Sequence, residues 1–171
     1  MDFEESESTL DIVHDVTAEL LRGVTIIRGL SVGDYKLVGA QFRHDLDFVN
    51  ALLNGLAECR IDYNARQRDP KVETIPAYAV EQMLFAVRRL QGFQPDLLHR
   101  LVSVRSEINE DRWHTSSVSR ELEFLHSHTV HHHALIAKIL SSVGHFVGHD
   151  VGVAPSTLKF RASIDPAFER S

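Results

Sequence analysis

Residues 124–140, FLHSHTVHHHALIAKIL, combine a strong helical pattern with the densest run of histidines in the chain. Successive residues of an α-helix turn by about 100°, and on that count the apolar residues around this segment share one face. Those residues are Leu122, Leu125, Ile136, Ile139, Leu140 and Val143. The pattern predicts a long amphipathic helix that Ser117 or Ser119 caps and that ends near Val143, where Gly144 follows.

The five histidines of this segment separate into two groups on the predicted helix. His128 and His132 fall on or beside the apolar face, whereas His131 points away from it and His126 and His133 lie on the other flank, at the rim or in solvent. His128 and His132 are one helical turn apart, so both rings can reach one point, as in a helix that chelates a transition-metal ion. Two inward histidines can also be hydrogen-bonded core residues.

A third ligand is needed, and the segment VGAQFRHDLDFVN (38–50) offers His44 at the edge of its apolar stripe. Gln41 and Asp45 fall on the stripe itself, where a polar side chain needs a partner. Each could orient a ligand ring or a bound water, and Asp45 could instead form a buried ion pair or cap another element. Glu121 lies one heptad before His128 on the same face, so Asp45 and Glu121 are the candidate catalytic groups.

The remaining histidines show no ligand spacing among themselves. His145 and His149 are candidates for the rim of the site, and the others are interpreted as surface residues: His14, His99 and His114. A di-iron bundle would need paired carboxylate ligands, yet the one Glu-x-x-His motif, Glu123 to His126, lies off the buried face. A mononuclear metalloenzyme and a non-catalytic bundle with structural or metal-sensing histidines both remain open.

The rest of the sequence predicts an all-α fold, a four-helix bundle formed by a single domain of 171 residues. The expected helices are about 8–27, begun by a capping box at STLD and ended by SVGD (31–34), about 35–57, 76–91 and the histidine-rich helix. The segment RIDYNARQRDPKVET (60–74) is predicted to be a surface loop and the tail 145–163 to be irregular. Residues 95–116 fit either a short β-hairpin or an extra helix.

Composition restricts the partners. The net charge is −6 and the basic residues are scattered, which argues against a nucleic-acid partner or an anionic membrane surface. Apolar runs fall short of the roughly 20 residues that a membrane span needs, and the start of the chain lacks the pattern of a signal peptide. The single cysteine, Cys59, suits a reducing cytoplasm and is interpreted as an inert apolar residue.

The segments VGAQFRHDLDF (38–48) and RELEFLHSHTVHHHALIAKIL (120–140), with IDYNARQRD and VGVAPSTLKF, resemble the DinB/YfiT-like metalloenzymes. This resemblance implies a four-helix bundle of up-down-down-up topology and a metal site at His44, His128 and His132. It also implies Zn²⁺ or Ni²⁺ as the metal, a homodimer, and a small-molecule substrate in hydrolysis or in thiol-dependent transfer with a low-molecular-weight thiol. The chain has Gln41 and Phe48 where such relatives often carry further histidines, which makes the predicted pocket drier.

Overall fold

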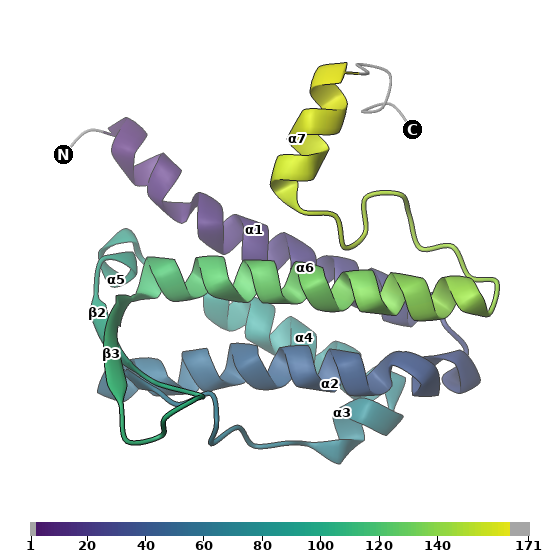
Figure 1. Cartoon of the computed structure of the whole chain (residues 1–171), viewed down its shortest axis with the longest axis horizontal. Helices are drawn as coiled ribbons and strands as arrows, with labels where there is room; N and C mark the ends of the chain where they lie inside the picture. The colour runs from purple at the N-terminus through teal and green to yellow at the C-terminus, as the bar shows by residue number, and fades with distance from the viewer. Residues whose placement is uncertain (1–2, 165–171) are drawn as a thin grey trace.

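Four long helices form the body of the protein in the computed structural model, which describes residues 3–164 and side chains from Leu10 onward. They are α1 (Phe3–Arg28), α2 (Val32–Gly55), α4 (Pro76–Gln91) and α6 (Val118–Ser142). Helices α1 and α2 each pack against both α4 and α6. Helices α1 and α6 run in one direction and α2 and α4 in the opposite direction (Figure 1).

The core between these helices is apolar, as the periodicity predicts. Its largest fully buried side chains come from all four helices and from the segments that join them: Tyr35, Phe42, Leu20, Ile27, Leu52, Ile61, Met83, Leu90, Leu98, Leu122, Leu125 and Ile136. Burial of this surface is the main force that holds the helices together. Within residues 3–164, none of the helices has the length and apolar character that a membrane span requires.

Helix boundaries follow local capping chemistry. Ser117 caps α6 by accepting a hydrogen bond from the Arg120 N–H, and Gly92 follows α4, both as predicted. Two predicted starts are wrong. Helix α1 begins at Phe3, so Ser8 lies inside it, and α2 begins at Val32 because Ser31 is the residue that caps it.

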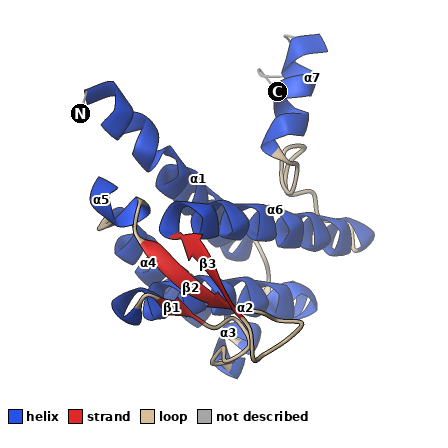
Figure 2. Ribbon diagram, turned by 60° about the vertical axis from the view of Figure 1, so that its left-hand side comes forward, coloured by secondary structure: helices blue, strands red, loops and turns tan. Residues whose placement is uncertain are grey.

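A small three-stranded sheet lies at one end of the helices. The chain is mostly helical, as predicted, but the fold is not purely α-helical. Strand β1 (Arg60–Ile61) pairs in parallel with β2 (Leu101–Arg105), and β2 pairs antiparallel with β3 (Trp113–Ser117). The hairpin interpretation of residues 95–116 is therefore confirmed, with a short helix α5 (Pro95–Leu98) before it. Figure 2 shows this sheet beside the start of α6.

Two segments expected to be irregular contain helices. The predicted surface loop 60–74 includes β1 and helix α3 (Pro70–Thr74), and α3 packs on α2. A 3₁₀ turn, η1 (Leu56–Glu58), precedes β1. Val72 of α3 is buried, and its carbonyl accepts the hydroxyl hydrogen bond of Tyr35. In the tail, Pro155 begins helix α7 (Pro155–Ile164), which stands away from the other helices (Figures 1 and 2).

The close contact between α2 and α3 depends on Gly39. A Cβ atom at this position would overlap the backbone carbonyl of Glu73, whereas one at Gly33 would meet only the Ser31 hydroxyl, at 3.6 Å. We expect Gly39→Ala to lower the free energy of unfolding by about 2 kcal/mol or more through overpacking. The matched Gly33→Ala change should be neutral or raise it by about 0.5–1 kcal/mol. Urea unfolding monitored by circular dichroism measures both, and equal stabilities would contradict this packing.

Candidate metal centre

Three histidines from two helices meet between α2 and α6. His44 comes from α2, and His128 and His132 come from α6. One nitrogen from each ring lies within 4.8 Å of the others, and the ring centroids are 4.5 to 5.2 Å apart. Among the described residues this is the one group of three or more His, Cys, Asp or Glu side chains with such spacing. The three predicted ligand positions are therefore brought together and could hold a metal ion.

Gln41 fixes the orientation of the His132 ring. Its side-chain oxygen Oε1 lies 2.7 Å from Nδ1 of His132. An amide oxygen only accepts a hydrogen bond, so Nδ1 carries the proton and the lone pair is on Nε2. The Nε2 atom of His132 is thus in the state that a metal requires. This contact matches the role that the sequence suggested for Gln41.

Asp45 occupies the corresponding place beside His128. The side chain of Asp45 is fully buried, and its Oδ1 accepts a hydrogen bond from the Thr129 hydroxyl at 2.9 Å. Nδ1 of His128 is 3.6 Å from the same oxygen, and neither this nitrogen nor Oδ2 of Asp45 has a hydrogen-bond partner. A small rotation would pair the ring N–H with the carboxylate, which is the common support of a metal-binding histidine. These two orphaned atoms fit a metal ion on Nε2 of His128.

Aromatic side chains lie beside two of the three histidines, His44 and His128. The Phe48 ring lies 4.1 Å from the His128 ring and 4.9 Å from the His44 ring, measured between centroids. Phe124 contacts His128 from within α6, at 5.8 Å. These contacts agree with the drier pocket that Phe48 predicts, and a dry pocket strengthens electrostatic interactions within it.

Burial lowers the pKa of two of the candidate ligands, His44 and His132. Burial is the largest cause that lowers the pKa of His132, to about 4, and the positive charge of His128 lowers it further. The pKa of His44 is also lowered, first by burial and then by the positive charges of His128, Arg66 and Arg43. A metal ion binds the neutral imidazole, so at neutral pH these two rings are ready to coordinate one.

Glu121, the other candidate catalytic group, lies outside the histidine group. Its carboxylate accepts hydrogen bonds from the hydroxyl of Tyr63, at 2.9 Å, and from that of Ser116, at 2.6 Å. It lines a neighbouring cavity of about 450 Å³, together with Tyr63, Phe124 and residues of the β2–β3 hairpin. In this structure Glu121 therefore joins α6 to the sheet and to the segment after β1.

His133 corrects the predicted division of the histidines. It was expected at the rim or in solvent, but its side chain is fully buried and its Nδ1 lies 2.9 Å from Oε2 of Glu19 on α1. The reason is that α6 packs against α1 as well as α2, so two of its faces are covered. His131 is exposed and His126 is half-buried.

Neither candidate rim histidine reaches the group. His145 pairs with Asp34 near the start of α2, at 3.2 Å, and His149 packs on Phe146. Sequence reasoning missed Thr129, which binds Asp45, and Arg66, whose guanidinium lies over Phe48. A threonine inside a helix and an arginine in a polar loop carry no sequence signal for such roles.

Comparisons with known proteins identify no relative of this chain. No family model, no curated protein and no solved structure matches it. The resemblance to the DinB/YfiT-like family therefore stays a prediction from the quoted motifs. The arrangement itself defines the class of site, a partly buried three-histidine group that could hold one metal ion.

The lowered pKa of His132 predicts how the metal-free protein responds to acid. An unfolded histidine has a pKa near 6.5, so between about pH 6.5 and 4 the unfolded state binds more protons than the folded state. The stability of the chelator-treated protein should therefore fall as the pH drops through this window. Urea unfolding between pH 7.5 and 4 measures the effect. The His132→Gln variant should lose less stability over the same range, and an identical loss would contradict the low pKa.

Proposed function

We propose that this chain is a mononuclear metalloprotein of the DinB-like type, in which His44, His128 and His132 bind one divalent ion, Zn²⁺ or Ni²⁺. One observation carries the proposal: three imidazoles from α2 and α6 offer their nitrogens within 4.8 Å of one another. The directions of the four long helices are consistent with an up-down-down-up bundle. Three nitrogen ligands with open positions are typical of catalytic rather than structural zinc sites.

The neighbouring side chains have distinct roles in this proposal. Gln41 and Asp45 set the tautomer and orientation of His132 and His128, so that both Nε2 lone pairs face the ion. Phe48 and Phe124 limit the access of water. A bound ion would act as a Lewis acid toward a water molecule or a low-molecular-weight thiol. Asp45 would hold the Nδ1–H of His128 and so increase the basicity of that ligand.

The reaction that we propose is metal-dependent transfer of a thiol, or hydrolysis, with a small molecule as substrate. The cavity of about 450 Å³ beside Tyr63 and Phe124 has a volume suited to a small molecule. Its aromatic wall adjoins the histidine group through the contact between Phe124 and His128. Ser-His-Asp order and phosphate-binding loops are lacking in the sequence, which leaves the three histidines as the main chemical feature.

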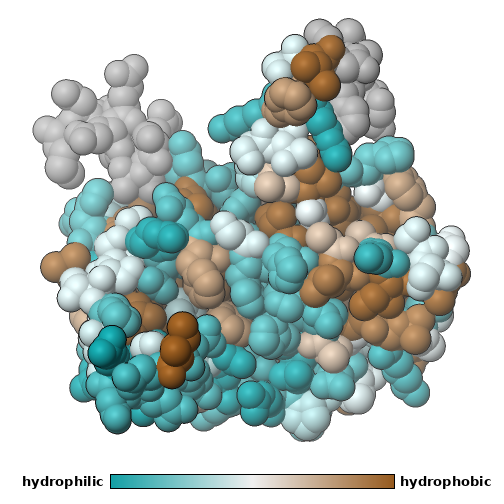
Figure 3. Space-filling model, in the orientation of Figure 1, coloured by the Kyte–Doolittle hydropathy of each residue, from teal (hydrophilic) through white to brown (hydrophobic). Residues whose placement is uncertain are grey.

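We also propose a homodimer, because apolar side chains remain exposed near the end of α6 and on α7. Phe146 is 72% exposed and Phe160 is 64% exposed. Apolar residues gather below α7 on the face seen in Figure 3. Large exposed apolar patches are typical of protein–protein contacts.

Metal analysis of protein purified without a histidine tag and without a nickel column tests the proposed function. We expect about one equivalent of Zn²⁺ or Ni²⁺ per chain in the wild type. His44→Ala and His132→Ala should lose it, because two imidazoles hold a metal ion weakly. His131→Ala is the matched control and should keep it, since His131 is exposed on the same helix. Metal-free wild-type protein whose melting temperature does not respond to either ion would contradict the proposal.

Loss of the contact from Gln41 should weaken metal binding without removing a ligand. We expect Gln41→Leu to raise the dissociation constant for Zn²⁺ about 10–100-fold, the usual effect of removing a hydrogen bond to a ligand ring. Gln91→Leu, at the exposed end of α4, provides a control. Competition with a chromogenic chelator gives both constants. An unchanged constant for Gln41→Leu would show that His132 needs no support from this amide.

A further inference from the structure

Two arginines lie close to the histidine group, and they differ in how their charges are balanced. Arg43 is paired with two carboxylates, Asp47 at 2.7 Å and Glu73 at 2.9 Å. Arg66 has one carboxylate partner, Glu107 at 3.5 Å, whose side chain is half-exposed. This pair is longer than those of Arg43, so the charge of Arg66 is less closely balanced.

The guanidinium of Arg66 has an N–H donor without a hydrogen-bond partner among the described residues. Its Nη1 donates to the carbonyl of Tyr63 and faces Glu107. Its Nε is buried and has no hydrogen-bond partner among the described residues. The unpaired Nε–H is a donor that an incoming acceptor could satisfy while the other contacts of the guanidinium remain. A guanidinium binds a carboxylate best through two parallel N–H groups.

The Phe48 ring contacts both Arg66 and two of the candidate metal ligands. The Cζ atom of Arg66 lies 4.3 Å from the centroid of the Phe48 ring. The same ring lies 4.1 Å from the His128 ring and 4.9 Å from the His44 ring. The separation between the histidines and the guanidinium is therefore comparable to the length of a short organic ligand.

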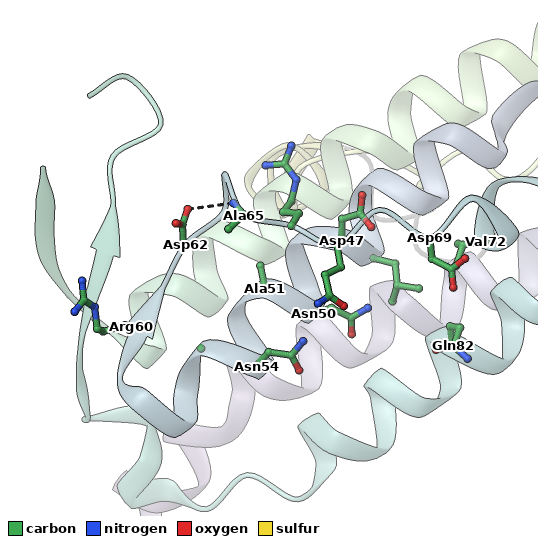
Figure 4. Close-up of a pocket in the computed structure, with 14 residues that line it drawn as sticks. Asp47, Asn50, Ala51, Asn54, Arg60, Asp62, Ala65, Asp69, Val72 and Gln82 are labelled. Carbon is green, nitrogen blue, oxygen red and sulfur yellow. Dashed lines mark hydrogen bonds between the residues drawn. The ribbon is translucent and has the colours of Figure 1, made fainter. Parts of the chain in front are cut away.

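Arg66 also lines a cavity. The cavity has a volume of about 390 Å³ and lies between α2, the 62–69 loop and Gln82 of α4. Figure 4 shows Asp47 and Asn50 of α2 facing the loop segment that carries Ala65, the residue before Arg66. The loop is held at its start by Asp62, which pairs with Arg105 at 2.9 Å.

Charge at the centre favours an anion. Three neutral imidazoles leave a divalent ion with its full charge of about +2. The carboxylate of Asp45 is buried behind His128 and bound by Thr129, and Arg43 is already paired. A ligand at the open position therefore meets two positive centres, the ion and Arg66.

We propose that the ligand of this centre carries an anionic group, in the simplest case a carboxylate, a few atoms from the atom that coordinates the metal, and that Arg66 binds this group. The inference rests on the proposed function, because it requires a metal ion on the three histidines. It gives Arg66 a role in substrate binding. From the sequence alone, Arg66 lies in a segment predicted to be a polar surface loop.

A different role for Arg66 must be separated from this one. Its contacts with Phe48 and with the Tyr63 carbonyl also hold the loop against α2. A residue that only holds the loop affects all ligands of the metal alike. A residue that binds the anionic group affects only ligands that possess one.

Two thiols make this distinction. Mercaptoacetate and 2-mercaptoethanol both offer a thiolate to the metal, but only the first carries a carboxylate. Cobalt(II) serves as the probe ion, since its absorption reports both metal uptake and thiolate coordination. The ratio of the two dissociation constants is measured for wild-type protein, Arg66→Gln, Arg66→Lys and Arg68→Gln. Because the same thiols are compared in every variant, the difference in their acidity cancels.

We expect the preference for mercaptoacetate to fall about tenfold in Arg66→Gln, the usual effect of losing a charged hydrogen-bonded pair. Arg66→Lys should retain part of it, because a lysine keeps the charge and loses the planar fork. Arg68→Gln removes an exposed charge from the same loop and should leave the ratio unchanged.

An equal loss of affinity for both thiols in Arg66→Gln, or an unchanged ratio, would overturn the proposal and leave Arg66 a structural residue. In either case cobalt uptake by the variant shows that the centre itself is intact. Failure of the wild type to take up cobalt, zinc or nickel would overturn the proposed function, and this inference with it.

Discussion

The packing of α2 against α6 is the constraint on which the structure of the site depends. This contact places a half-exposed histidine of one helix opposite two histidines of the other, and it buries the polar groups that surround them. Buried imidazoles and carboxylates lose their hydration, so each needs a partner within the protein. Gln41 provides one for His132, and Thr129 provides one for Asp45. Nδ1 of His128 and Oδ2 of Asp45 stay unpaired, beside the point where the rings converge.

The surroundings of the three histidines combine aromatic rings with positive charge. Phe48 and Phe124 contact His128 and reduce the access of water, whereas Arg43 and Arg66 place positive charge near His44. Positive neighbours and burial both favour neutral imidazoles, the form that binds a metal ion. If a cation binds to the three histidines, these positive neighbours would also favour an anionic ligand on it.

Helical periodicity predicted α4 and α6 well, because each buries a defined apolar stripe between clear end signals at Pro76, Gly92 and Ser117. It also selected His44, His128 and His132, since their positions on the helices depend only on local geometry. It failed for His133, which is covered by α1, and for α3, whose burial depends on Gly39 of α2. Those features depend on which helices become neighbours, which a repeat along one helix does not reveal.

The sequence by itself determined a mostly helical chain with two inward histidines one turn apart, because the α-helix fixes the direction of every side chain relative to its own axis. Only the tertiary structure decided that His44 lies opposite that pair, that Gln41 contacts the His132 ring and that Asp45 lies beside the His128 ring. It also decided that Glu121 is bound by Tyr63 and Ser116 and that Arg66 lies over Phe48. Such contacts join residues far apart in the chain, and they arise from the register and packing of whole helices.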